Sequence, residues 1–133
     1  MQPITAEMLL CPCCHTGQPD QRLIASLNHL QNDLGTQLQI NSGCRCPKHN
    51  ADVGGAPNSK HLSGIAADIT AAGRSPLELY LAADQQPLFH DGGIGLYPLD
   101  FIHIDVRRER ARWYRQASQD HPITDYLHHA DAS

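Results

Sequence analysis

Residues 59–68 of the 133-residue chain read Ser-Lys-His-Leu-Ser-Gly-Ile-Ala-Ala-Asp, and residues 100–105 read Asp-Phe-Ile-His-Ile-Asp. These two stretches supply imidazoles at His61 and His103 and a carboxylate at Asp68, all of which are suitable donors to zinc. A catalytic zinc takes three protein ligands and keeps its fourth position for water. The two stretches together therefore predict a zinc site.

The residues around these donors favour the same interpretation. Gly64 allows the chain to turn tightly, and the small residues at 66 and 67 let the backbone that carries Asp68 approach a neighbouring strand closely. His103 and Asp105 point to one face if the second stretch is a strand, because side chains alternate. Asp105 could then orient an imidazole. Spacing alone is a weak argument, since most histidine and aspartate pairs in soluble proteins lie on the surface.

Helices are predicted on both sides of the first stretch. Pro19–Leu34 has apolar residues on one helical stripe and is followed by Gly35, which predicts a core-facing helix. Ser75, Pro76 and Glu78 form a helix start, with a capping box and a helix that runs to about Asp84. Residues 107–116 are charged and also predict a helix. The tail from Gln119 onward is polar, and we expect it to be frayed.

Short apolar or alternating runs predict four strands, at 37–41, 65–69, 93–97 and 101–106. The last two form an expected antiparallel hairpin with its turn at Pro98 and Leu99. Residues 42–63 are rich in glycine, proline and asparagine and lack apolar periodicity, so they predict a long irregular loop. Long ordered loops in small domains are usually functional.

Length and composition set the limits of the interpretation. With 133 residues and 41% hydrophobic content, the chain predicts a single domain, 1–133. We expect a core at about 20–116, a cysteine-containing N-terminal arm at 1–18 and a polar C-terminal tail at 117–133. The formal net charge of -4 and the absence of a basic stripe argue against a nucleic-acid partner. No apolar run is long enough to predict membrane insertion.

Five cysteines lie in two clusters, Cys11, Cys13 and Cys14 in the arm and Cys44 and Cys46 in the loop. A disulfide between the clusters would anchor the arm to the core, in an oxidising compartment. Reduced thiols could instead pack as small apolar groups. A second, structural zinc is a third alternative, in which Cys11 and Cys14 would form the common C-x-x-C pair. We rank the disulfide and the packed thiols above the metal.

The quoted segments resemble the M15 family of zinc peptidases, which includes D-Ala-D-Ala carboxypeptidases and peptidoglycan endopeptidases. Residues 59–68 match every fixed position of its signature S-x-H-x-x-G-x-A-x-D, and His103 stands in the later H-x-D context. Residues 42–50 are similar to its S-G-x-R-x-x-x-H-N element. The likeness runs from about Leu23 to Trp113. It implies a small α+β domain whose antiparallel sheet carries the zinc, with helices packed on one side, as in D-Ala-D-Ala carboxypeptidases and Hedgehog domains.

The resemblance also implies the metal site and the catalytic base. His61, Asp68 and His103 would bind one Zn²⁺ per chain. Asp100, three residues before His103, would be the catalytic base, although aspartate is also common in hairpin turns. Asp105 is the alternative base.

Three further residues are expected to bind substrate, and for Arg45 the resemblance itself implies this. Arg45 would meet a substrate carboxylate or the polarised carbonyl oxygen, a task suited to its fork of donors; a surface charge is the alternative. Ser59 and Tyr97 would also contact substrate. The alternatives for these two are a helix cap for Ser59 and a core aromatic for Tyr97.

By the same resemblance, the chain would hydrolyse peptide bonds in the peptidoglycan stem peptide, as a D-Ala-D-Ala carboxypeptidase or an L-Ala-D-Glu type endopeptidase. The alternative is a catalytically inactive zinc-containing module that binds the wall or a protein. We expect a monomer. The first ten residues lack the features of a signal peptide. We therefore expect synthesis in a bacterial or phage-infected cytoplasm and delivery to the periplasm or wall by another route.

Overall fold

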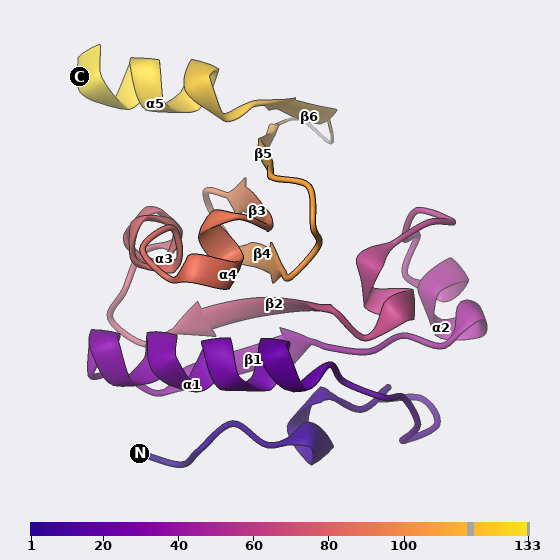
Figure 1. The fold of residues 1–133 in the computed structure, drawn as a ribbon. Coiled ribbons are helices and arrows are strands. Elements are labelled where there is room, and N and C mark those ends of the chain that lie inside the picture. Colours follow the sequence, from indigo (N-terminus) through magenta and orange to yellow (C-terminus); the bar gives the residue numbers. More distant parts are fainter. Residues whose placement is uncertain (117–118, 133) are drawn as a thin grey trace.

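A computed structural model of the chain describes residues 1–116 and 119–132. In this part of the chain, one sheet has the strand order β1-β2-β4-β3-β5-β6. The strands are β1 (Leu38–Ser42), β2 (Ala66–Ala71), β3 (Gly93–Tyr97), β4 (Phe101–Asp105), β5 (Ala111–Gln116) and β6 (Gln119–Pro122). The helices are η1 (Ala6–Leu9), α1 (Gln21–Leu34), α2 (Pro47–Asp52), η2 (Lys60–Ser63), α3 (Pro76–Ala83), α4 (Pro87–His90) and α5 (Ile123–Ala132). Figure 1 shows their arrangement.

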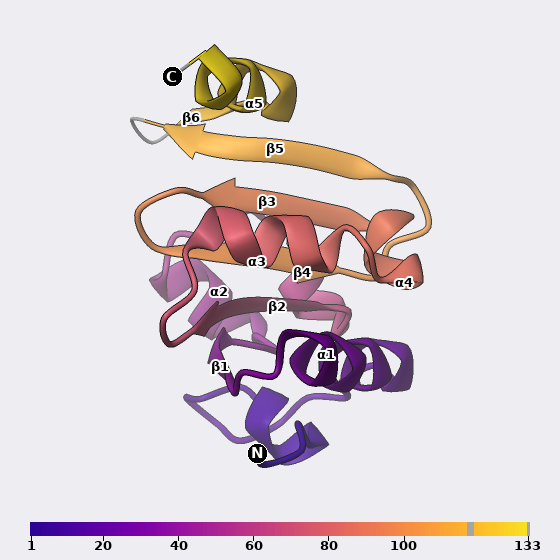
Figure 2. The ribbon, with the colours of Figure 1, turned by 90° about the vertical axis from the view of Figure 1, so that its left-hand side faces the viewer.

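Helices α1, α3 and α4 cover one face of the sheet, and α2 lies behind the opposite face (Figure 2). The apolar core lies between the sheet and these three helices. Leu23, Leu27 and Leu30 of α1 are fully buried there, as are Ile69 of β2 and Ile104 of β4. The predicted α+β class is confirmed, and the helices that enclose the apolar core pack on one side of the sheet.

The predicted helix boundaries follow from their capping residues. The carboxylate of Asp20 accepts a hydrogen bond from the backbone N–H of Arg22 at 2.7 Å, and so caps the start of α1. Gly35 ends α1 in the left-handed conformation with φ of 64°, which glycine adopts without steric cost. Ser75 and Glu78 form the predicted capping box at the start of α3. The hairpin of β3 and β4 is likewise confirmed as antiparallel.

The predicted helix at 107–116 is wrong, because residues 111–116 form β5. Trp113 and Tyr114 favour an extended chain, and β5 pairs with β3 in parallel, with Gly95 opposite Trp113. One pair in the otherwise antiparallel sheet is therefore parallel. Of the two arginines of β5, Arg115 is partly exposed, whereas the Arg112 side chain is mostly buried and forms an ion pair with Asp84.

Two other segments are more regular than the sequence predicts. The loop at 42–63 contains the short helices α2 and η2. The expected frayed tail instead forms β6 and α5, as far as it lies within the described residues. β6 pairs antiparallel with β5, and Ile123 at the start of α5 is buried in the core. The core also takes in Ile4 and Leu9 of the N-terminal arm. No helix in the described residues is long and apolar enough to cross a bilayer.

Arg112 joins β5 to the segment around α4. Its guanidinium donates to the Asp84 carboxylate at 2.6 Å and to the backbone carbonyls of Gly92 at 2.7 Å and His90 at 2.8 Å. Burial by itself would raise the pKa of Asp84, but the hydrogen bond from Arg112 outweighs it, and the pKa is lowered. The ion pair therefore stabilises the fold when Asp84 is ionised.

We expect Arg112→Met to lower the free energy of unfolding by about 3 kcal/mol, because it leaves a partly buried carboxylate and several carbonyls without their donor. Arg110→Met is the matched control, since Arg110 is half exposed and lies 3.6 Å from Asp84; its cost should be about 0.5 kcal/mol. The contribution of the pair is present above the unfolded-state pKa of aspartate, about 3.9, and is lost as pH falls through the lowered folded-state pKa. Denaturant titrations at neutral and acid pH should therefore show that the difference in unfolding free energy between the wild type and Arg112→Met is smaller at acid pH. An equal deficit for both variants would contradict this account.

Candidate metal centre

Two neighbouring strands and a short helix bring the three predicted ligands together. Asp68 of β2 lies directly opposite His103 of β4 in the antiparallel register. His61 comes from η2, whose start is capped by the Ser59 hydroxyl, which accepts from the His61 N–H at 3.2 Å. Gly64 ends η2 with φ of 75°, and a Cβ there would lie 2.4 Å from the carbonyl oxygen of Gln18. Only glycine allows the chain to turn into β2 at this point.

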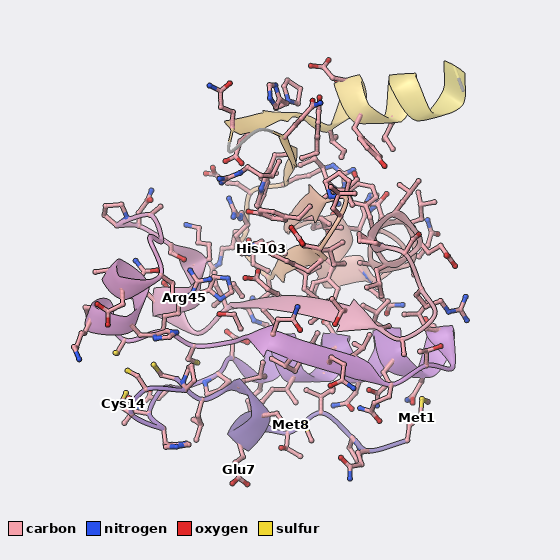
Figure 3. All side chains as sticks on the ribbon, turned by 180° about the vertical axis from the view of Figure 1, so that it is seen from behind. Met1, Glu7, Met8, Cys14, Arg45 and His103 are labelled. Atoms are coloured by element: carbon pink, nitrogen blue, oxygen red, sulfur yellow. The ribbon has the colours of Figure 1, made fainter. Side chains whose placement is uncertain are left out.

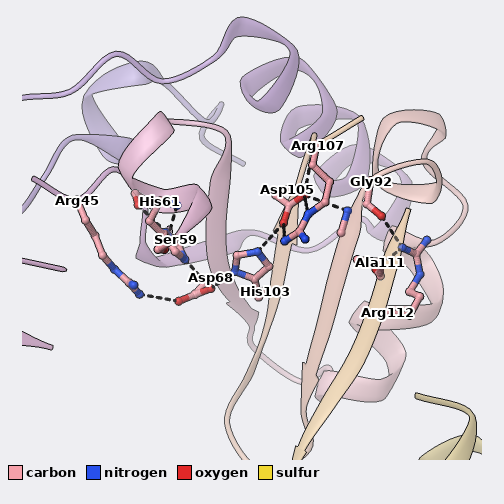
Figure 4. Close-up of polar contacts among 12 residues, drawn as sticks. Arg45, Ser59, His61, Asp68, Gly92, His103, Asp105, Arg107, Ala111 and Arg112 are labelled. Atoms are coloured by element: carbon pink, nitrogen blue, oxygen red, sulfur yellow. Dashed lines mark hydrogen bonds and ion pairs between the residues drawn. The ribbon is translucent and has the colours of Figure 1, made fainter. Parts of the chain in front are cut away.

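The donor atoms of His61, Asp68 and His103 lie within 4.8 Å of one another. Oδ1 of Asp68 is 3.2 Å from Nε2 of His61 and 3.1 Å from Nδ1 of His103. The three residues are 2%, 6% and 8% exposed, respectively. Figure 4 shows the two imidazoles on either side of the Asp68 carboxylate.

The second nitrogen of each imidazole has its own partner. Nδ1 of His61 lies 2.7 Å from the backbone oxygen of Gly43, and Nε2 of His103 lies 2.8 Å from Oδ2 of Asp105. Both partners are acceptors, so each of these nitrogens carries the proton. Nε2 of His61 and Nδ1 of His103 both face Oδ1 of Asp68. In the neutral imidazoles that metal ligation requires, these two nitrogens are the ones available to bind an ion.

Asp105 is fully buried and is held by several donors. Arg107 donates to its two oxygens at 2.8 and 2.6 Å, and the backbone N–H of Gly93 donates at 3.0 Å. A Cβ at Gly93 would lie 2.5 Å from Asp105 Oδ2, so glycine makes room for this carboxylate. These contacts fix Asp105 as the partner of His103.

Charges in the cluster shift one another's pKa. Burial by itself would raise the pKa of Asp68, but hydrogen bonds from His103 and His61 outweigh it, and the pKa is held well below its usual range. The pKa of Asp105 is also held well below its usual range, because hydrogen bonds from His103 and Arg107 outweigh the effect of burial. Burial would lower the pKa of His103, yet its hydrogen bonds to Asp105 and Asp68 raise it. The carboxylates therefore stay ionised, as metal ligation requires.

Arg45 reaches the edge of this cluster. One of its terminal nitrogens lies 3.4 Å from Oδ2 of Asp68, the oxygen that does not face the imidazoles. Its Nε donates to the Ser42 hydroxyl at 3.2 Å, and its other terminal nitrogen donates to the Asn50 side chain at 3.3 Å. Asn50 in turn donates to the backbone oxygen of Ala56 at 2.9 Å. Arg45 is thus held in place from three directions beside the ligands.

An open groove passes over the cluster. Its lining includes the three ligands together with Arg45, Ser59, Lys60, Tyr97, Phe101, Arg107, Trp113, Arg115, Asp120 and residues 53–56 and 58. Tyr97 stacks on Phe101 with ring centroids 4.3 Å apart. The predicted substrate-binding residues therefore all face one groove. Asp100 lies apart from them: it is exposed, in the turn between β3 and β4, and is not among the lining residues.

The sequence comparison agrees with this geometry. A family model described as Peptidase M15 matches residues 4–105, which include the three clustered residues and end at Asp105. The chain belongs to the peptidase M15 family. A search of curated proteins found no match for the chain.

As an M15 peptidase, the chain is a hydrolase of a family that depends on zinc, and its cluster fits that ion. Two imidazole nitrogens and one carboxylate oxygen form a donor set typical of catalytic zinc. Among the described residues, this cluster holds three such groups and no fourth. Each imidazole also has the hydrogen-bonded partner that metal-binding histidines usually have.

Arg107 and Trp113 were not predicted from the sequence as residues of this M15 peptidase site. Arg107 holds Asp105 and lies 5.4 Å from the Trp113 ring, and Trp113 lies 5.2 Å from the His103 ring. A Cβ at Gly95 would lie 2.4 Å from the Trp113 ring, so glycine at this position of β3 leaves room for the indole. The position of Arg107, two residues after Asp105, could have suggested its contact with that carboxylate. The wrong helix prediction for residues 107–116 led away from this interpretation.

Proposed function

We propose that this M15 peptidase hydrolyses peptide bonds in the stem peptide of bacterial peptidoglycan, with zinc bound by His61, Asp68 and His103. The main support is the placement of this buried donor cluster at the floor of an open groove. Zinc held there would supply Lewis-acid activation of a water molecule and polarisation of the scissile carbonyl. A site with three protein donors favours an enzyme over a module with a closed metal.

The groove suits an acidic peptide. Arg45, Lys60, Arg107 and Arg115 are among its lining residues, and stem peptides carry carboxylates on D-Glu and at the terminal D-Ala. Charge complementarity of this kind orients a ligand more than it tightens binding. Tyr97 and Trp113 offer flat surfaces for the apolar parts of the peptide. We propose that Arg45 binds the substrate carboxylate or the carbonyl oxygen, with Ser59 and Tyr97 beside it.

The catalytic base would be an acidic residue close to the zinc. Asp100 keeps this role on the resemblance alone, because its exposed carboxylate lies outside the groove lining. Asp105 is committed to His103 and Arg107. Besides Asp68, the acidic residue that lines the groove is Asp120, which pairs with Arg115 at 2.6 Å. Comparing Asp100→Asn with Asp120→Asn distinguishes them: the base is the carboxylate whose loss removes the acid limb of the rate profile against pH.

A defined pentapeptide muropeptide tests the proposal. Zinc-loaded protein should cleave it, lose activity with a chelator and regain it with zinc. Mass spectrometry of the products identifies the bond, because loss of the terminal D-Ala means a carboxypeptidase and cleavage after L-Ala means an endopeptidase. If folded, zinc-loaded protein leaves the muropeptide intact, the alternative of a non-catalytic zinc module is supported instead.

Arg45→Lys should lower kcat/KM by about 10- to 100-fold. Lysine keeps the positive charge but loses the paired N–H donors of the guanidinium, and a hydrogen bond to a charged group contributes about 1.5–3 kcal/mol. Zinc content should stay unchanged, since Arg45 is not one of the donors. Kinetics and elemental analysis of the same preparation check both statements. Unchanged kcat/KM would show that Arg45 only supports the loop through Ser42 and Asn50.

A further inference from the structure

We propose that Cys11, Cys13, Cys14 and Cys46 bind a second metal ion, a structural zinc held by four thiolates. This site is separate from the hydrolytic centre and does not depend on the proposed function. Three of its ligands come from the N-terminal arm and the fourth from the start of α2. Figure 3 shows sulfur atoms gathered near Cys14, at the end of the molecule that carries α2.

The four sulfur atoms are spaced for one ion. Sγ of Cys13 lies 3.5 Å from Sγ of Cys11 and 3.3 Å from Sγ of Cys46. All four Sγ atoms lie within 4.8 Å of one another. A zinc ion with bonds of about 2.3 Å to sulfur separates its ligands by about 3.8 Å in a tetrahedron. A small adjustment of side chains would therefore complete the coordination shell.

The backbone around the cluster resembles that of a metal knuckle. Cys11 and Cys14 have the C-x-x-C spacing, and the turn between them is closed by hydrogen bonds from Cys11 N–H to Thr16 at 2.8 Å and from His15 N–H to Cys11 at 2.7 Å. Two backbone N–H groups also point at sulfur, that of Cys46 at Cys11 Sγ, 3.4 Å away, and that of His49 at Cys46 Sγ, 3.3 Å away. Such donors stabilise thiolate charge and orient metal ligands.

From the sequence, a disulfide and packed thiols ranked above a metal, but each of these explains the positions of only some of the cysteines. All five cysteines are free thiols in the structure, and Cys13 lies almost equally far from two different sulfurs. A disulfide from Cys13 to Cys11 would leave Cys46 and Cys14 unexplained, and one from Cys13 to Cys46 would leave Cys11 and Cys14 unexplained. Packing as small apolar groups describes Cys11 and Cys44, which are buried, but Cys13 and Cys14 are exposed. Four sulfurs gathered from two distant segments are explained together by a shared ion.

A bound ion would fasten the N-terminal arm to the segment that supports the hydrolytic centre. The arm already contacts this segment, because Cys44 N–H donates to the Leu9 carbonyl at 2.8 Å. Gly43 packs against Leu9, and its backbone carbonyl accepts a hydrogen bond from Nδ1 of His61. Arg45 lies directly before Cys46. The thiolate site would thus act as a positioning device for the Gly43–Cys46 segment.

Zinc content per chain tests the proposal. Protein purified under reducing conditions and loaded with zinc should contain two ions per chain, and the His61→Ala/His103→Ala variant should contain one. Cys13→Ser/Cys14→Ser should also lose one ion; both residues are exposed, so the apolar core is preserved. Cys44→Ser is the matched control and should keep both ions, because Cys44 lies outside the cluster.

Cobalt provides a readout that needs no cysteine variant to fold. Cobalt-loaded His61→Ala/His103→Ala protein should show the sulfur-to-cobalt charge-transfer absorption of a tetrahedral thiolate site. Absence of that absorption, or reaction of all five thiols with an alkylating reagent in zinc-loaded protein, would overturn the proposal, as would a disulfide in the purified protein. If only the His61→Ala/His103→Ala variant loses an ion, the hydrolytic site is supported and the thiolate site is overturned. If only the Cys13→Ser/Cys14→Ser variant loses an ion, the thiolate site is supported and zinc binding at the hydrolytic centre is not.

Discussion

His103→Ala should lose the zinc of the hydrolytic centre and reduce hydrolysis by about a thousandfold or more. Lewis-acid assistance by zinc corresponds to several kcal/mol of transition-state stabilisation, and each 1.36 kcal/mol is tenfold in rate. The side chain is one of three candidate donors in the cluster, and the described residues of the cluster include no fourth. Asp68→Asn should have a similar effect, because a neutral amide replaces the central carboxylate.

Zinc content and kcat/KM should be measured on the same preparations. His29→Ala is the matched control, since His29 is exposed on α1 and should leave both quantities unchanged. Asp68→Asn preserves side-chain volume, so it separates loss of the metal from loss of packing. Far-ultraviolet circular dichroism confirms that each variant is folded. A folded His103→Ala protein that retains full zinc and activity would show that this cluster is not the hydrolytic centre.

Local patterns in the sequence predicted the two strands that carry Asp68 and His103, but not the short helix η2 that carries His61. The apolar stripe of α1 and the capping box at Ser75 are local signals, and local rules predicted both helices. Residues 59–68 and 100–105 gave the donor types, and alternation along β4 put His103 and Asp105 on one face. The register of β2 against β4, which sets Asp68 opposite His103, required the three-dimensional structure.

Long-range pairing explains what the sequence did not predict. β5 forms a strand because its backbone pairs with β3 at Trp113 and Tyr114. No local pattern in residues 107–116 predicts this pairing. β6 and Ile123 depend in turn on β5. Arg107 and Trp113 therefore entered the site only once this pairing was known. The sulfur cluster is similar, because Cys46 is 35 residues from Cys11, and the spacing within each segment could not reveal their proximity.

Asp105→Asn should weaken zinc binding at the hydrolytic centre by about 10- to 100-fold, the usual cost of losing a carboxylate behind a metal-binding histidine. In the wild type, Nε2 of His103 donates a hydrogen bond to Asp105. In the neutral imidazole this contact leaves Nδ1, the nitrogen beside Asp68, available to the metal. The amide of asparagine can donate to Nε2 instead. That contact would favour the tautomer with its proton on Nδ1, which blocks the donor atom.

The pH dependence gives this prediction a signature that simple loss of packing would not produce. Because Asp105 and Asp68 raise the pKa of His103, protons compete with zinc in the wild type as soon as pH falls to that raised value. With asparagine at 105 the pKa is lower, so proton competition begins at a lower pH. The affinity ratio of wild type to variant should therefore be largest at alkaline pH and should narrow in acid. Competition titrations against a chromophoric chelator at several pH values measure this ratio, with Asp105→Glu as the control that keeps the acceptor. A ratio independent of pH would mean that Asp105 acts only through its contacts with Arg107 and Gly93, and not through the proton on His103.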